Sequence, residues 1–95
     1  MVTHIVCFKY KPEVDEAARA GHRGALKDLA KIDGLIDLHV GADLVGSARS
    51  YHTGLIATFP NRAALDAYQK HPQHVPVAQH GVSLCEHIVA VDFEE

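Results

Sequence analysis

Hydrophobic residues alternate with polar ones in some segments of this chain and recur at helical spacing in others. Segments with a period of two residues, rich in β-branched side chains, predict strands. We expect these strands at residues 2–10, 35–41, 51–59 and 84–93. Residues 41–50 contain two glycines and two serines without periodicity, so we expect a mobile loop there.

Helices are expected between the strands. The first spans residues 13–31, with acids in its first turn and lysines near its end, as the helix dipole favours. Asn61 is well placed to cap the second helix. That helix is expected to stop near His71, because a residue before proline disfavours the α region. Pro72 then starts a short further turn or helix up to Gly81.

The expected order β-α-β-β-α-β is the ferredoxin-like arrangement, which belongs to the α+β class. Two helices can cover only one face of a four-stranded sheet. The first and last strands are nevertheless apolar on both faces. We therefore expect a homodimer in which the two sheets pack face to face.

The spacing of the first helix predicts its inward face. This face comprises Val14, Ala18, Gly21, His22, Ala25, Leu29 and Ile32. Several of these residues are small, so the helix either approaches the sheet closely or leaves a cavity lined by His22 and the even-numbered residues of the first strand. The cations Arg19, Arg23, Lys27 and Lys31 are expected to form a solvated face, with Asp15 supporting Arg19.

Composition limits the function classes. The 95 residues are expected to form one domain, residues 1–95. A net charge of −3 argues against nucleic acid or an anionic membrane as a partner. The sequence predicts neither a secretory signal nor a membrane span, so we expect a cytoplasmic protein. Cys7 and Cys85 lack metal-ligand spacing and are expected to be small core residues.

Two of the eight histidines are candidates for acid–base chemistry. His4 lies in the apolar first strand, and His74 lies just after the helix-ending Pro72. The histidine pKa near neutrality would let such a pair accept and donate protons. A hydrogen-bonded structural role is the alternative for each ring. The spacing of His71 and His74 also suggests metal binding, but the usual carboxylate-containing signature is missing, so no metal is expected.

Three segments in combination resemble the stress-responsive dimeric α/β-barrel (Dabb) family over nearly the whole chain. They are His4-Ile5-Val6-Cys7-Phe8-Lys9-Tyr10-Lys11, Val40-Gly41-Ala42-Asp43 and, after Phe59, Leu65-Asp66-Ala67-Tyr68-Gln69-Lys70-His71-Pro72-Gln73-His74. The resemblance implies a ferredoxin-like protomer and a β-barrel at the centre of a homodimer.

Plant members of the family that resemble this chain are polyketide cyclases, which close a poly-β-keto chain by aldol condensation without a cofactor. Their functional histidines match His4 and His74, and a helix tyrosine matches Tyr68. If the protein is an enzyme, we expect His74 to be the base and His4 and Tyr68 to polarise or position a carbonyl group. The expected substrate-binding residues are Val6, Phe8, His22, Leu26 and His71. The plant cyclases carry bulky aromatics near His22, Arg23 and Leu26, so a more polar pocket is expected here.

We therefore expect a small-molecule pocket and, in an enzyme, cofactor-free cyclase, lyase or isomerase chemistry on a small carbonyl compound. Two alternatives stay open. One is a non-catalytic stress-response or ligand-binding protein whose histidines are structural. The other is a monooxygenase of similar fold.

Overall fold

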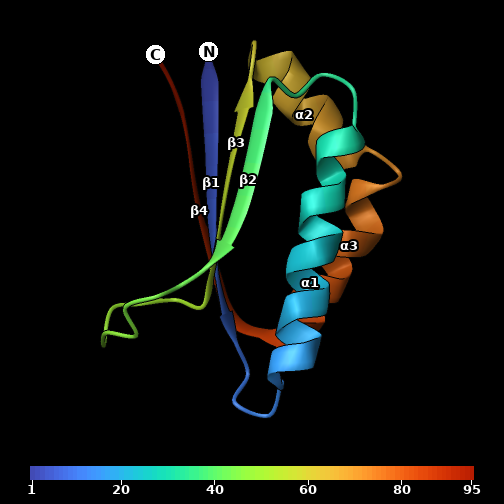
Figure 1. Cartoon of the computed structure of the whole chain (residues 1–95). Helices are drawn as coiled ribbons and strands as arrows, with labels where there is room; N and C mark the ends of the chain where they lie inside the picture. Colours follow the sequence, from blue (N-terminus) through green and yellow to red (C-terminus); the bar gives the residue numbers. More distant parts are fainter.

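Backbone hydrogen bonds join four strands into one antiparallel sheet, and the helices lie on one of its faces (Figure 1). The computed structural model describes residues 1–95. In chain order the elements are β1 (Val2–Tyr10), α1 (Glu16–Asp28), a 3₁₀ turn (Leu29–Lys31), β2 (Asp37–Ala42), β3 (Thr53–Phe59), α2 (Arg62–Lys70), α3 (His74–Leu84) and β4 (Cys85–Glu94). The strand order β2-β3-β1-β4 confirms the predicted ferredoxin-like arrangement.

Local side-chain and backbone preferences determine the ends of the first two helices. The Asp15 carboxylate accepts a hydrogen bond from the Ala18 amide at 2.9 Å, so α1 begins later than the predicted residue 13. Asn61 caps α2 as predicted. His71 has an extended backbone before Pro72, and α2 therefore ends where the proline rule places its end.

The third helix is more regular than the sequence suggests. The sequence predicts a short turn or helix from Pro72 to Gly81, whereas α3 starts at His74 and continues into β4. Pro76 lies in the first turn of α3, where backbone N–H groups have no acceptor within the helix, so the ring does not interrupt it. This geometry makes His74 the first residue of α3.

The interior strand β1 separates the two faces of the sheet. Its side chains alternate between buried and half-buried along the whole strand. Those that face the helices and are buried are Val2, His4, Val6, Phe8 and Tyr10. The intervening side chains lie on the opposite face.

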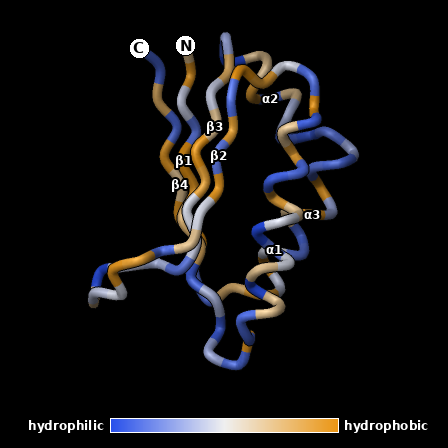
Figure 2. Tube along the Cα trace, in the orientation of Figure 1, coloured by the Kyte–Doolittle hydropathy of each residue, from blue (hydrophilic) through white to orange (hydrophobic).

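The opposite face is apolar at its centre and uncovered in the single chain. The register places Ile5 between Ile56 of β3 and Val91 of β4. Val89 and Phe93 share this face because they lie two residues to either side of Val91. Ile56 is 42% exposed and Val91 is 53% exposed. Hydrophobic residues recur along these strands (Figure 2), and the register places Ile5, Ile56 and Val91 together on the uncovered face.

Helix α1 contacts the sheet through only part of the predicted face, because His22, Leu29 and Ile32 are buried as expected whereas Ala18 and Gly21 are not. Its buried residues are His22 and Leu26, and Leu29 in the 3₁₀ turn continues the stripe. Ala18 and Gly21 are exposed, so the prediction that these small residues face the sheet or border a cavity is wrong. The physical reason is that α1 turns Arg19 and Arg23, with their long apolar stems, toward the sheet.

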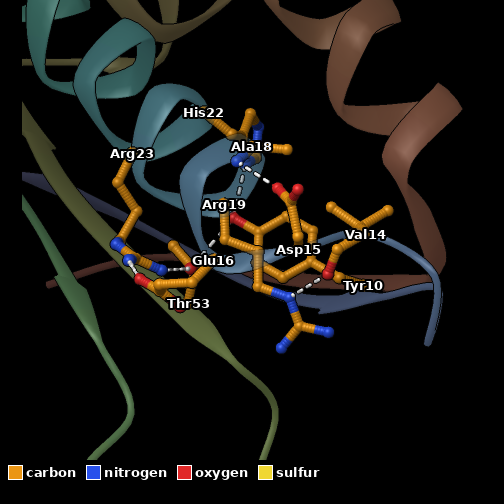
Figure 3. A network of polar contacts seen from close by, with 9 residues as sticks. All are labelled: Tyr10, Val14, Asp15, Glu16, Ala18, Arg19, His22, Arg23 and Thr53. Atoms are coloured by element: carbon orange, nitrogen blue, oxygen red, sulfur yellow. Dashed lines mark hydrogen bonds and ion pairs between the residues drawn. The ribbon is translucent and has the colours of Figure 1, made fainter.

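A polar cluster joins α1 to the end of the sheet (Figure 3). The Tyr10 hydroxyl lies 2.6 Å from Nδ1 of His22 and 3.0 Å from Oγ1 of Thr53. Arg23 donates to the same Thr53 oxygen at 3.3 Å and pairs with Glu16 at 2.5 Å. The cluster therefore runs from a buried imidazole to a carboxylate at the surface.

Arg19 takes part in this cluster rather than in a solvated face. Its guanidinium carbon lies 5.2 Å from the centre of the Tyr10 ring, and its Nε donates to the Val14 carbonyl at 2.9 Å. Asp15 caps α1 and is not the partner of Arg19. The expectation of a solvated Asp15–Arg19 pair is therefore wrong.

His22 is held tightly within this cluster. It is 1% exposed, and its Nε2 has no hydrogen-bond partner. Burial, followed by the nearby His80 and Arg23, lowers the pKa of His22 to about 4. A methyl group on Gly81 would lie 3.1 Å from this Nε2, so a side chain at position 81 would compress the ring.

Replacing glycine in two helices tests this packing. Gly21→Ala should stabilise the fold by about 1 kcal/mol, because position 21 is open and alanine favours helix. Gly81→Ala should instead cost about 1–3 kcal/mol, because His22 cannot move away from Tyr10. Urea denaturation of both variants measures the difference. Equal stabilisation by the two alanines would show that the contact between Gly81 and His22 is loose.

The titration of His22 predicts acid sensitivity. In the unfolded chain the pKa of His22 is near 6.5, whereas in the folded protein its pKa is about 4. Stability should therefore fall as the pH drops through this window, by up to about 1.4 kcal/mol per pH unit. His22→Asn should be less stable at pH 7 but show a shallower acid slope. Parallel curves of unfolding free energy against pH for wild type and variant would contradict this assignment.

Candidate functional site

A cavity of about 250 Å³ lies between the helix-covered face of the sheet and the three helices. Eleven of its fifteen lining residues are hydrophobic, so its walls are mainly apolar. The lining comprises His4, Val6, Phe8, Leu26, Leu29, Leu55, Tyr68, Gln69, His74, Val77, Ala78, Val82, Ile88, Ala90 and Asp92. A few polar groups in an apolar cavity are typical of a small-molecule site.

The first polar feature of the cavity is a pair formed by His4 of β1 and Asp92 of β4. The antiparallel register places Asp92 directly opposite His4. Nδ1 of His4 forms a hydrogen bond with the Asp92 carboxylate. With Nδ1–H donating to this carboxylate, Nε2 is the nitrogen that remains for a ligand. His4 is only 5% exposed, so the carboxylate also satisfies a polar group within the core.

His74, at the start of α3, is the second polar group. Its Nδ1 lies 3.2 Å from the Gln69 carbonyl oxygen and donates to it, which leaves Nε2 as an acceptor. Burial lowers the pKa of His74, with smaller contributions from His4 and His71, while the bond to Gln69 acts in the opposite direction. The neutral ring, which can accept a proton, is therefore favoured at pH 7.

Tyr68 lies between the two histidines. The centre of its ring is 6.1 Å from that of His4 and 4.5 Å from that of His74. Burial raises the pKa of Tyr68 to about 12, so its hydroxyl stays protonated and can donate a hydrogen bond. The structure thus brings together a neutral imidazole, a phenol and a carboxylate-bound imidazole.

The structure brings six of the eight predicted site residues to the cavity. The six are His4, Val6, Phe8, Leu26, Tyr68 and His74. His22 lies outside the lining, where its ring packs edge-on against Phe8 at 5.0 Å between centres. His71 also lies outside it, and its Nδ1 accepts a hydrogen bond from the Gln73 amide.

Sequence reasoning missed Asp92. This residue continues the alternation of Ile88 and Ala90 toward the helix-covered face, and that pattern was available in the sequence. Its pairing with His4, however, depends on the β1–β4 register, which the sequence alone did not define.

A more polar groove adjoins the cavity, since Gln69 and Asp92 line both. It lies beside α2 and the end of β4 and contains the carboxylates of Asp66, Asp92 and Glu94. Its one cation, Arg62, pairs with Asp66 at 3.1 Å. The groove is therefore negative on balance.

Neither a metal-binding cluster nor a membrane-spanning helix accompanies the cavity. No three His, Cys, Asp or Glu side chains gather in a way that could hold a metal ion. None of the helices combines the length and the apolar character that crossing a membrane requires.

Comparisons with known proteins agree with this fold. A stress-response A/B barrel domain-containing protein of Arabidopsis thaliana is 30% identical over 98% of this chain. The chain spans only 36% of that relative's length. A dimeric ferredoxin-like protein of unknown function from Thermobifida fusca is 28% identical, with a TM-score of 0.90 over 99% of this chain and 90% of its own.

A hydroxynitrile lyase from Passiflora edulis has a TM-score of 0.87 over 97% of this chain and 90% of its own. Its identity of 21% demonstrates a shared fold alone. The family model described as Stress responsive A/B Barrel Domain matches residues 2–95. Since this match covers nearly every residue, the chain belongs to the stress-responsive A/B barrel (Dabb) family.

Proposed function

We propose that the cavity binds a small uncharged carbonyl compound and that its histidines transfer protons on that compound without a cofactor. The observation that carries this proposal is the grouping of His74, Tyr68 and the His4–Asp92 pair in an otherwise apolar cavity. The neutral ring of His74 and the protonated hydroxyl of Tyr68 suit separate roles, and the Asp92 carboxylate holds the His4 ring beside them.

His74 is the proposed general base. Its neutral ring accepts the proton from the carbon next to the carbonyl, while Nδ1 remains bonded to Gln69. The electron pair of the broken C–H bond moves onto the carbonyl oxygen, which becomes an enolate. The carbon of this enolate can then attack a second carbonyl group, and protonated His74 returns its proton to the alkoxide that forms, as an aldol cyclisation requires.

Tyr68 and His4 are proposed to stabilise the enolate oxygen. The protonated phenol donates a hydrogen bond to developing negative charge in a mainly apolar site. Asp92 orients the His4 ring and stabilises the positive charge that the ring gains if it takes up a proton. Asp92 is thus a positioning residue in this proposal.

Charge around the cavity favours an uncharged substrate. No lysine or arginine lines the cavity, whose one carboxylate is already bonded to His4. The adjoining groove adds Asp66 and Glu94. A substrate carboxylate or phosphate would therefore lose its hydration without gaining a cationic partner.

Proton exchange provides a direct test. Cyclohexanone and phenylacetone are incubated with the protein in D₂O, and loss of the α-proton signal is followed by NMR. His74→Gln should slow this exchange by about 100-fold or more. The wild-type rate should persist below pH 6.5 and fall only as the pH passes through the lowered pKa of His74, because the base must be neutral.

Matched variants and substrates sharpen this test. His71→Gln removes a neighbouring histidine outside the cavity and should leave the rate unchanged. Pyruvate, which carries a carboxylate, should exchange no faster than in buffer. Binding of the ketones without exchange would reject the catalytic proposal and favour the non-catalytic ligand-binding alternative. An undiminished rate in His74→Gln would remove His74 as the base.

We also propose that the chain forms a homodimer through the uncovered sheet face. Ile56, Val89, Val91 and Phe93 expose apolar side chains there, and water contact with such a face is unfavourable. The 28% identical relative from Thermobifida fusca is dimeric. A second copy would cover the face symmetrically.

A charge on this face should separate the subunits. Val91→Asp would bury a carboxylate against apolar side chains and should weaken dimerisation at least about a hundredfold, as measured by sedimentation velocity. The control is Ile36→Asp. Ile36 is 54% exposed, like Val91 at 53%, but it precedes β2, which lies at the edge of the sheet opposite to β4. Equal dissociation constants for the two variants would reject this interface.

A further inference from the structure

The loop between β2 and β3 presents two apolar side chains to water. We call residues 43–52 the arm. Leu44 is 92% exposed and Val45 is 71% exposed, the two highest values among the large hydrophobic residues of the chain. Neighbouring side chains that are this exposed contribute nothing to the packing of their own subunit.

Hydrogen bonds give the outer part of the arm a defined shape. The Asp43 carboxylate accepts from the Gly46 amide at 2.7 Å, and Gly46 adopts a positive φ of 67° that favours glycine. Ser47 and Ser50 close the next turn through backbone and hydroxyl bonds of 2.8–3.0 Å. Leu44 and Val45 are therefore carried by a bonded turn.

The foot of the arm is fixed to the end of β1. The His52 amide donates to the Phe8 carbonyl at 2.9 Å, and the Tyr10 amide donates to Nδ1 of His52 at 3.0 Å. The rings of His52 and Tyr10 stack at 5.9 Å between centres. The Asp43 amide donates to the His52 carbonyl, so the first and last residues of the arm are bonded to each other. These contacts set the direction in which the arm leaves the sheet.

That direction is toward the uncovered sheet face. Figure 1 shows the arm leaving the sheet on the side opposite the helices. This is the same side as the apolar face around Ile56 and Val91. A second copy bound to that face would meet the arm, and holding the arm in place beforehand lowers the entropy cost of the contact.

We propose that the arm packs against the partner subunit and that Leu44 and Val45 are buried in that contact. This inference rests on the proposed homodimer and adds a second interface element outside the sheet. By two-fold symmetry, each dimer contains two such contacts. With the arms, the dimer buries more apolar area than the two sheets bury alone, so the arms add to its stability.

The test combines Leu44→Ser with Val45→Ser in the full chain. These side chains make no packing contribution within the subunit, so circular dichroism should show an unchanged fold. The dissociation constant of the dimer, from sedimentation velocity over a dilution series, should rise about a hundredfold. The control is Ile36→Ser, which changes an exposed apolar side chain just before β2, outside the arm, and should leave the dissociation constant unchanged.

Trypsin gives an independent readout at Arg49 within the arm. Cleavage after Arg49 should be slow in the wild-type dimer and fast in the monomeric Val91→Asp variant, with the fragments identified by mass. If Leu44→Ser with Val45→Ser leaves the dissociation constant unchanged and Arg49 is cut as fast in the wild-type dimer as in monomeric Val91→Asp, the arm contact is overturned and the homodimer stays intact. A monomeric wild-type chain would overturn both proposals.

Discussion

The antiparallel pairing of β1 with β4 determines where both the cavity and the uncovered face lie. One set of alternating residues places His4 opposite Asp92 beneath the helices, and the other set places Ile5 opposite Val91 on the free side. A shift of β4 by one residue in this register would exchange the two faces of β4. Asp92 would then leave the helix-covered side, and the His4 ring would lose its carboxylate partner. Chemistry and assembly therefore depend on one strand pair.

The two buried histidines His22 and His4 have different roles, one in packing and one at the cavity. His22 bonds to Tyr10 on one side and packs against Gly81 on the other, so no space remains for a ligand. His4 is bonded on one side as well, but its other side borders the cavity. Burial is nearly complete in both cases, so burial alone does not distinguish a structural from a functional histidine. What distinguishes them is whether the free side of the ring borders a cavity.

Local sequence signals predicted the strands, the Asn61 cap and the proline-terminated end of α2, because each depends on residues close together in the chain. The inward placement of Ala18 and Gly21 was mispredicted, since the long stems of Arg19 and Arg23 can cover a sheet as apolar residues do. Resemblance and alternation identified six of the fifteen cavity residues, including His4, Tyr68 and His74. Asp92 was missed because its partner lies at the opposite end of the chain, and only the tertiary register brings the two together.

Strand β4 links the proposed chemistry to the proposed dimer. Ile88, Ala90 and Asp92 line the cavity, while the residues between them point to the uncovered face. In the single chain β4 is an edge strand, bonded only to β1 and exposed beyond Cys85. A second copy packed on that face would restrain the strand from the side opposite the cavity. The position of the Asp92 carboxylate, and with it the orientation of His4, would then depend on assembly.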